Sequence, residues 1–280
     1  MIATETPVRG AAPPLAALLS RGRPLVMGIL NVTPDSFSDG GRFFDPQVAL
    51  AHARQMAADG ADILDVGAES TRPYGGAKPV SADEEQQRLE HVLPAVTALG
   101  VPVSIDTMKA AVADWAVRAG AAIINDVWGL QRDPDMAGVV ARHGVPVIVM
   151  HNREQADAPD VMADVHAFFE RSLAIAERAG IARDKIVLDP GVGFGKTPEQ
   201  SMTVIARLAE FKRFGLPLLV GASRKRFIDK VSPAPPDRRL GGSIVSHALA
   251  VQNGAMIIRA HDVPETVQAL RVLGAIGSRR

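Results

Sequence analysis

The sequence contains no cysteine in its 280 residues. This absence excludes disulfide bonds and metal sites built from thiolates, and it favours a cytoplasmic location. The chain also has no apolar run that approaches the roughly 20 residues of a membrane-spanning helix. Its first residues lack a basic start followed by an unbroken apolar stretch, so we expect no secretory signal peptide.

An excess of charge is missing as well, because 31 lysines and arginines balance 31 aspartates and glutamates. The composition therefore gives no indication of nucleic acid or an anionic membrane as a partner. The dinucleotide-binding pattern G-x-G-x-x-G is absent after the first strand-like run. Residues 189–197, DPGVGFGKT, resemble the phosphate-binding loop G-x-x-x-x-G-K-S/T, but Pro190 occupies the position of the first glycine. We therefore do not expect nucleotide hydrolysis.

Short apolar runs alternate with longer amphipathic ones along most of the chain. Strands are expected at residues 25–30, 61–66, 102–106, 121–126, 145–150, 185–189, 217–221 and 255–260. Helices are expected at residues 46–60, 82–100, 108–120, 134–144, 161–180, 198–211, 240–254 and 263–276. The strands are apolar throughout, as strands buried on both faces are. Eight strand–helix units predict a single-domain α/β fold, a TIM (β/α)8 barrel over residues 23–280, with residues 1–22 as an N-terminal tail that holds at most one helical turn. A doubly wound open sheet is the alternative.

Polar side chains follow every predicted strand. In a TIM barrel the site is built at the C-terminal ends of the strands. The residues at these ends are Asn31, Asp65, Glu69, Ser70, Thr71, Arg72, Asp106, Asn125, Asp126, His151, Asp189, Ser223, Arg224, Lys225, Arg259 and His261. One polar strand end is explained by capping or by a turn, but eight together predict a functional site.

The residues at these ends divide into two chemical groups. Asp106, Asn125 and Asp189 can accept hydrogen bonds from a ring edge with several N–H donors, such as a 2-amino-pyrimidinone. The alternatives for two carboxylates are a general acid and base, or a metal site. Lys225, Arg259 and His261 are donors that predict an anion site, since barrels often bind phosphate near strands seven and eight. A salt-bridged surface is the alternative, and it is favoured for Arg224 or Arg226 alone. The glycines of residues 189–197 are expected to let the backbone approach a flat ligand beside Phe194.

Seven segments between residues 24 and 272 stand out: MGILNVTPDSFSDGG, GADILDVGAESTRP, SIDTMKAAVA, INDVWGL, LDPGVGFGKT, LLVGASRKRF and IIRAHDV. Together they resemble the dihydropteroate synthase family. Members of this family are TIM barrels, usually homodimers, and are the target of sulfonamides. They condense 6-hydroxymethyl-7,8-dihydropterin diphosphate with 4-aminobenzoate to give 7,8-dihydropteroate and diphosphate, assisted by Mg²⁺. The chain departs from the family pattern at three positions. Asn152 in MHNR stands where the family often has methionine, Arg226 in SRKRF where some members have serine, and Ala260 in RAHD where valine is commoner.

The resemblance implies a role for each matching residue. Those implied to bind the pterin are Asp106, Asn125, Asp189 and Lys225. Those implied to bind the diphosphate are Asn31, Thr71, Arg259 and His261, with Asn31 also a ligand of magnesium. Those implied to surround the 4-aminobenzoate are Phe37, Thr71, Arg72, Pro73, Phe194 and Lys225. The implied catalytic residues are Asp39, Arg72, Asp106 and Lys225, of which Asp39 and Arg72 belong to two loops that the family closes over its site.

Three other functions are consistent with parts of the pattern. A pterin-dependent methyltransferase barrel shares the aspartate–asparagine–aspartate group but has no diphosphate to bind, so Lys225, Arg259 and His261 argue against it. A non-catalytic pterin-binding paralogue is disfavoured by the intact loop sequences. A barrel aldolase would need a Schiff-base lysine inside a strand, and none is evident.

Overall fold

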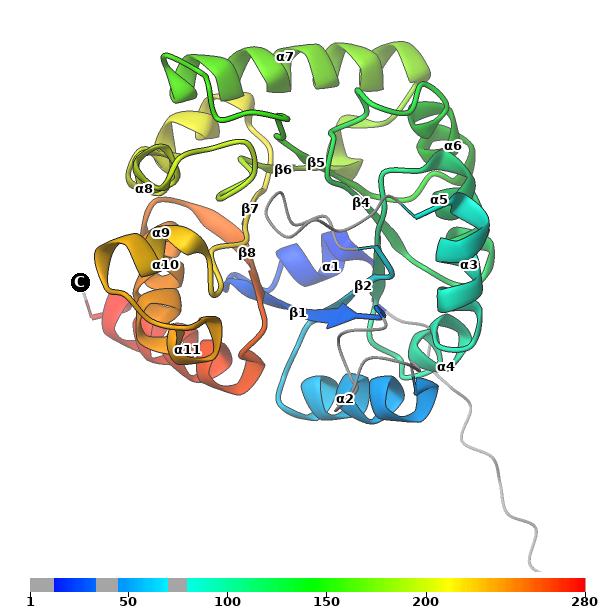
Figure 1. The fold of residues 1–280 in the computed structure, drawn as a ribbon, viewed down its shortest axis with the longest axis horizontal. Helices are drawn as coiled ribbons and strands as arrows, with labels where there is room; N and C mark the ends of the chain where they lie inside the picture. Colours follow the sequence, from blue (N-terminus) through cyan, green and yellow to red (C-terminus); the bar gives the residue numbers. More distant parts are fainter. Residues whose placement is uncertain (1–12, 34–44, 70–79, 280) are drawn as a thin grey trace, which may run out of the picture.

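The structure is a computed structural model that describes residues 13–33, 45–69 and 80–279. Eight parallel strands form a closed barrel in chain order, with helices around it (Figure 1). The strands are β1 (Leu25–Asn31), β2 (Ile63–Gly67), β3 (Val103–Asp106), β4 (Ile123–Asp126), β5 (Val147–Met150), β6 (Ile186–Asp189), β7 (Leu218–Val220) and β8 (Ala255–Ala260). All eight predicted strands are present, so the predicted TIM barrel is confirmed.

The predicted helices are present with two exceptions, and one further helix, Arg226–Val231, forms where none is predicted. The helices are α1 (Leu15–Leu19), α2 (Pro46–Ala58), α3 (Ala82–Glu90), α4 (Leu93–Thr97), α5 (Ala110–Arg118), α6 (Met136–His143), α7 (Val161–Ala179), α8 (Pro198–Ala206), α9 (Arg226–Val231), α10 (Leu240–Gln252) and α11 (Val263–Gly277). Short 3-10 helices cover Arg183–Lys185, Leu208–Phe214 and Pro236–Arg238. No helix in the described ranges is long and apolar enough to cross a membrane.

Both exceptions are predicted single helices that are interrupted in the structure. The helix expected at residues 82–100 is split into α3 and α4, because Pro94 cannot donate a backbone hydrogen bond and starts a new helix instead. The helix expected at 198–211 ends at Ala206. There Asn253 donates its side-chain Nδ2 to the carbonyl oxygens of Ile205 and Ala206, at 2.9 and 3.3 Å, and so caps the helix end.

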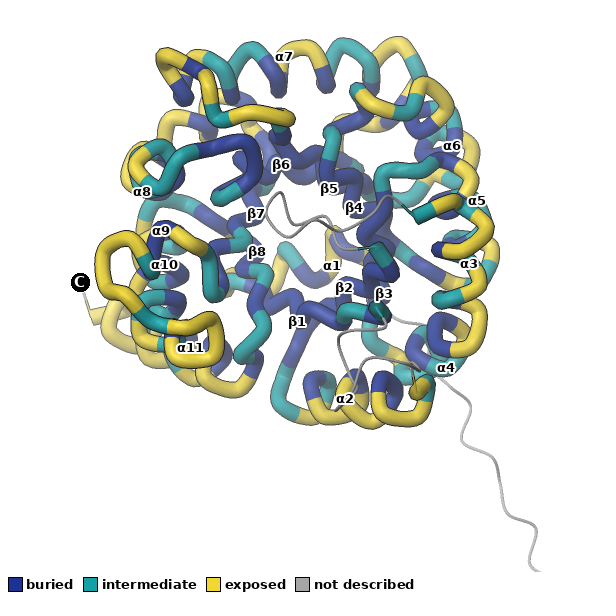
Figure 2. The backbone as a smooth tube through the Cα atoms, in the orientation of Figure 1, coloured by how far each residue is buried: buried dark blue, intermediate teal, exposed yellow. Residues whose placement is uncertain are grey.

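The barrel has two apolar layers. The larger one fills the space between the strands and the surrounding helices. Figure 2 shows the buried strands as a central ring and the outer faces of the helices as exposed. The smaller one lies inside the barrel at the N-terminal ends of the strands. Its members are Leu15, Leu18, Leu25, Met27, Ile63, Ile123, Ile148, Val187, Leu219 and Ile257.

Helix α1 lies within the segment that the sequence places in the tail. Its Leu15 and Leu18 are buried in the inner layer, and the helix is visible through the centre of the barrel in Figure 1. Residues 21–23 continue the attachment, because Arg21 and Arg23 donate to the buried carboxylate of Asp62 at 3.1 and 2.6 Å. The tail up to β1 therefore closes the bottom of the barrel from residue 15 onward.

Candidate active site

The parallel register brings the polar strand ends to one rim. Asn31 pairs with Gly67, Gly67 with Asp106, and Asp106 with Asn125 around the barrel, while Asp189 ends β6 beside Met150. These positions are opposite to the end that α1 closes. The hollow at this rim has a volume of about 20 Å³, and it is lined by Asp106, Asn125, Val127, Met150, Asp189, Gly191, Val192, Phe194, Gly221, Lys225 and Arg259. The structure thus brings together six of the sequence-predicted site residues.

Arg259 links the two predicted chemical groups. Its Nε donates to Asp65 Oδ2 at 2.6 Å, and its Nη2 donates to Asp106 Oδ2 at 2.8 Å. Asp65 Oδ2 also accepts from Asn125 Nδ2 at 3.1 Å. The sequence marks Asp65 as a strand-end residue but gives it no role, because nothing local indicates that a side chain on β8 reaches across the barrel to it. In the structure it orients both Arg259 and Asn125.

Three buried oxygen acceptors at this rim have no hydrogen-bond partner among the described residues. They are Asp65 Oδ1, Asp106 Oδ1 and Asn125 Oδ1. Buried acceptors without a partner are costly, because they lose their hydrogen bonds to water without replacement. A cluster of three therefore indicates a site built for a ligand that brings several N–H donors.

The carboxyl groups at the rim have perturbed acidity. Burial raises the pKa of Asp106 to about 7, against the opposing effect of Arg259. Burial also raises the pKa of Asp189 to about 6, although the Gly191 N–H that donates to its Oδ1 at 2.8 Å counteracts this. Both groups therefore titrate near neutral pH, which is typical of functional carboxylates.

The segment between β6 and α8 supplies the aromatic wall. Phe194 is buried against Val127 and Met150, and the Lys225 ammonium lies 3.8 Å from the centre of its ring. Gly191 has a φ of +65°, and a Cβ there would overlap the carbonyl oxygen of His151. A Cβ at Gly195 would collide with Arg153. At these two positions the close approach is to the protein backbone after β5, not to the ligand that the sequence suggested.

The cationic end of the rim has its own internal contacts. His261 contacts Ser223 Oγ through its backbone N–H at 3.2 Å and through Nδ1 at 3.0 Å. Arg224 forms an ion pair with Asp262, which confirms the salt-bridged alternative for this residue. Asn152, which departs from the family pattern, accepts a hydrogen bond from the backbone of Arg153 at 2.8 Å. Its role in the structure is thus a local cap.

Several predicted site residues lie outside the described residues: Phe37, Asp39, Thr71, Arg72 and Pro73. Thr71, Arg72 and Pro73 lie between the described residues Glu69 and Val80. These two are hydrogen-bonded to each other, because Glu69 Oε1 accepts from the Val80 N–H at 3.1 Å. The other oxygen of Glu69 pairs with Lys109 at 2.5 Å, and Lys109 also pairs with the fully buried Glu85 at 2.6 Å.

Asn31 ends β1 at the rim and is half-buried. The described part of the chain contains no group of three or more His, Asp or Glu side chains able to hold a metal ion. A metal at this rim would therefore take few ligands from these residues. That suits Mg²⁺, which usually keeps several waters and binds phosphate oxygens of the substrate.

A larger hollow of about 730 Å³ lies outside the barrel, between the segments after β4 and β5 and helix α7. Its arginines face carboxylates and rings of the protein itself: Arg153 pairs with Asp157 and Asp164, and Arg132 stacks on Trp128. Because its charges are already matched, we place the functional site at the smaller, more buried hollow.

Comparisons with known proteins show the family of this chain. Residues 27–261 match the family described as pterin binding enzyme. A dihydropteroate synthase of Bacillus subtilis is 47% identical over 93% of this chain and 91% of its own length. Two solved structures of Xanthomonas albilineans dihydropteroate synthase each cover 91% of this chain and 94% of their own. The one with 4-aminobenzoic acid has 44% identity and a TM-score of 0.87, and the one with 7,8-dihydropteroate has 41% and 0.84.

Proposed function

The chain belongs to the dihydropteroate synthase family, and we propose that its rim binds the pterin through Asp106, Asn125, Asp189 and Lys225. The enzyme is a transferase that condenses 6-hydroxymethyl-7,8-dihydropterin diphosphate with 4-aminobenzoate, releasing 7,8-dihydropteroate and diphosphate in folate biosynthesis. We propose on the same basis that it is a target of sulfonamides. The observation that carries the residue assignment is the cluster of buried, unpartnered acceptors on Asp65, Asp106 and Asn125 within the described ranges.

The pterin edge carries the N–H donors that these acceptors lack. One oxygen of Asp189 accepts from Gly191, which leaves the other for the ligand. Acceptors that come from different strands, such as Asp106, Asn125 and Asp189, can together fix both the position and the orientation of the ring. When ionised, the same carboxylates stabilise the positive charge that develops on the pterin ring as the leaving group departs.

The diphosphate is assigned to the cationic end of the rim. Two nitrogens of Arg259 are engaged by Asp65 and Asp106 within the described residues, so Nη1 is the nitrogen available for phosphate oxygens. Lys225 and His261 supply further donors, and Asn31 and Thr71 complete the assignment. Asn31 would also hold Mg²⁺, which when bound would neutralise the charge that develops on the leaving diphosphate.

The 4-aminobenzoate is assigned to the space next to Phe194 and Lys225, together with Phe37, Thr71, Arg72 and Pro73. The Lys225 ammonium on the face of Phe194 gives this space one aromatic wall and one positive charge. The catalytic roles of Asp39, Arg72, Asp106 and Lys225 remain part of the proposal. The reaction forms a C–N bond to the amine and breaks the C–O bond to diphosphate, while the amine loses a proton.

We also propose a cytoplasmic homodimer. Helix α10 exposes Val245 and Leu249, and the neighbouring helix α11 exposes Val272 and Ile276, each pair one turn apart; we take these two helices as the dimer face. An isologous dimer would remove this face from water.

The activity is tested by incubating the protein with both substrates and Mg²⁺ and measuring 7,8-dihydropteroate and diphosphate. We expect both products in equal amounts from the wild type and a large loss in Asp189→Asn. Release of diphosphate without dihydropteroate would contradict the condensation.

A further inference from the structure

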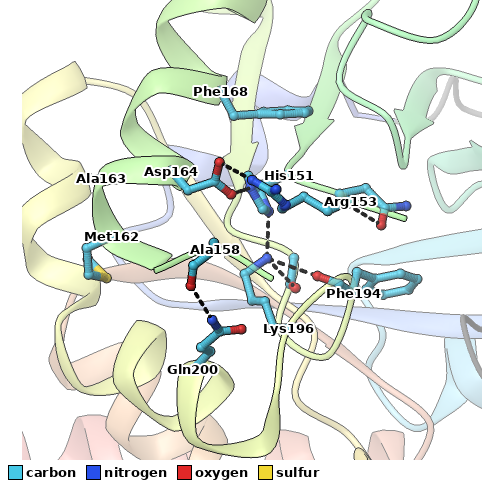
Figure 3. Close-up of polar contacts among 12 residues, drawn as sticks. His151, Arg153, Ala158, Met162, Ala163, Asp164, Phe168, Phe194, Lys196 and Gln200 are labelled. Atoms are coloured by element: carbon cyan, nitrogen blue, oxygen red, sulfur yellow. Dashed lines mark hydrogen bonds and ion pairs between the residues drawn. The ribbon is translucent and has the colours of Figure 1, made fainter. Parts of the chain in front are cut away.

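Lys196 is a buried charged side chain that the reaction does not use. It ends the β6–α8 segment and is 2% exposed. Its Nζ donates to the carbonyl oxygens of Gly191 at 3.0 Å and Phe194 at 3.1 Å, and lies 2.6 Å from His151 Nδ1 (Figure 3). All three partners are acceptors that can be satisfied by one ammonium group, which has three N–H bonds.

The hydrogen bonds beyond Lys196 fix the protonation of its partners. If Nδ1 of His151 accepts from the ammonium, the neutral ring carries its hydrogen on Nε2, which donates to Asp164 Oδ2 at 2.8 Å. Burial lowers the pKa of His151 to about 4, and the bond from His151 lowers the pKa of Asp164, so both agree with a neutral ring and an ionised carboxylate. Asp164 Oδ1 is held in turn by Arg153 at 2.5 Å. The chain from Lys196 to the surface of α7 is therefore completely hydrogen-bonded.

The segment that Lys196 spans needs such support. Gly191, Gly193 and Gly195 all have positive φ, so this stretch has large conformational freedom in the absence of restraints. Its exit is anchored separately. Thr197 and Gln200 form a reciprocal cap at the start of α8, and Gln200 Nε2 donates to the Ala158 carbonyl at 2.8 Å. Between these anchors, Lys196 is the side chain that ties two carbonyl groups of the turn together.

Three groups of the active site depend on the position of this turn. The Gly191 N–H donates to Asp189, the Phe194 ring forms the aromatic wall, and Lys225 lies on that ring. Figure 3 shows Lys196 contacting the backbone of Phe194, whose ring extends away from it. A shift of the turn therefore displaces the wall without any contact between Lys196 and the substrate.

We propose that Lys196, supported by His151 and Asp164, is a positioning residue that holds the Gly191–Phe194 turn and thereby shapes the 4-aminobenzoate subsite. This inference rests on the proposed function for the identity of the ligand. It assigns a role to a lysine whose sequence context suggests only an incomplete phosphate-binding loop.

The charges around Lys196 make its hold dependent on pH. Burial lowers the pKa of Lys196 to about 7. The charges of Lys225 and Arg153 also lower this pKa, whereas those of Asp189 and Asp164 raise it. The remaining titratable group that faces Lys196 is His151, which is neutral and lies between Lys196 and Asp164. The ammonium therefore donates three hydrogen bonds below neutral pH and loses one donor as the pH rises through about 7.

The test compares Lys196→Met with Lys230→Met, an exposed lysine on α9 that serves as the matched control. In Lys196→Met without substrates, the amides of residues 191–196 should exchange hydrogen at least about tenfold faster than in the control. With the pterin substrate saturating, the KM for 4-aminobenzoate should rise by roughly tenfold to a hundredfold, as misplacement by about 1 Å does. The KM for the pterin substrate should rise by a smaller factor, because Asp189 ends strand β6 and only its contact with the Gly191 N–H depends on the turn.

The pH profile separates positioning from a general loss of stability. In the wild type, the KM for 4-aminobenzoate should rise between about pH 6 and pH 8.5, and in Lys196→Met it should be high and flat. Should that variant fail to fold, Asp164→Asn near the surface replaces it. Removing this anion should move the wild-type transition to lower pH, because Asp164 favours the ammonium.

Either of two results with Lys196→Met would overturn the proposal: unchanged exchange at residues 191–196, or equal increases of both KM values with a lowered melting temperature. An unmoved transition in Asp164→Asn would do the same. If the wild type forms no dihydropteroate, the proposed function fails instead, while the exchange experiment still reports on the turn.

Discussion

Replacing Arg259 with methionine should destabilise the protein even in the absence of ligand. The substitution keeps a long side chain but removes the cation between Asp65, which is fully buried, and Asp106. Breaking a buried ion pair by removing one partner costs about 3–5 kcal/mol. Asp106 can take up a proton in compensation, since its pKa is already about 7. We therefore expect a loss of about 2–4 kcal/mol in the free energy of unfolding.

The pH dependence of this loss has a defined sign. The folded-state pKa of Asp106 is raised above its unfolded value, so ionisation of this group costs stability as the pH rises from about 4 toward 7. Arg259 is the largest factor that lowers this pKa. Without it the pKa rises further, and the cost continues above pH 7. The difference between wild type and Arg259→Met should thus be larger at about pH 8 than at about pH 5.

Differential scanning calorimetry at both pH values measures the effect. Since about 1 kcal/mol shifts the midpoint by roughly 2–4 °C in proteins near this size, the melting temperature should fall by roughly 4–16 °C at about pH 8. Lys225→Met is the matched control and should lose less, because it removes a rim cation that lies on the Phe194 ring rather than between two hydrogen-bonded carboxylates. Added diphosphate should protect both variants less than the wild type. An unchanged melting temperature of Arg259→Met at both pH values would refute the reasoning.

Three further predictions follow from other parts of the structure. Asp189→Asn should weaken pterin binding by about 2–5 kcal/mol in calorimetric titration, and in the wild type affinity should fall as the pH drops below about 6, where this carboxylate takes up a proton; unchanged affinity would contradict the assignment. Leu18→Ala should lower the free energy of unfolding in urea by about 2–5 kcal/mol, because Leu18 is 1% exposed inside the barrel; a neutral effect would mean that α1 does not support the fold. Leu249→Asp should shift the mass measured by light scattering from dimer to monomer, whereas Val48→Asp on α2 should not, and a monomeric wild type would exclude the dimer.

Periodicity predicts the barrel well because each strand is apolar on both faces and each helix on one. The strand ends then follow from the fold, so the sequence alone is enough to place Asp106, Asn125 and Asp189 on one rim. Interruptions within a helix are harder to predict from the sequence. Pro94 is a local signal for the break between α3 and α4, but the cap from Asn253 comes from a distant part of the chain.

Long-range side-chain contacts are the part of the site that the sequence does not reveal. The resemblance assigns Arg259 to diphosphate, yet its contacts with Asp65 and Asp106 depend on β8 closing against β1. Lys196 and His151 are 45 positions apart, and only the fold shows that they touch. A lysine in a glycine-rich segment after a buried strand is the one signal that could have indicated a structural role.

The contact between Asp65 and Arg259 spans 194 positions of the chain. During synthesis on the ribosome, β2 and its buried aspartate leave the exit tunnel long before the arginine on β8 has been made. Until then the carboxylate lacks this cation, and the open edge of β1 has no neighbouring strand on the side where β8 pairs. Such a nascent chain is exposed to aggregation, because unpaired strand edges recruit other chains. The requirement for the last strand makes assembly of the active site one of the final events of folding, and a product truncated before residue 259 should be a substrate for chaperones and proteases rather than a partly active enzyme.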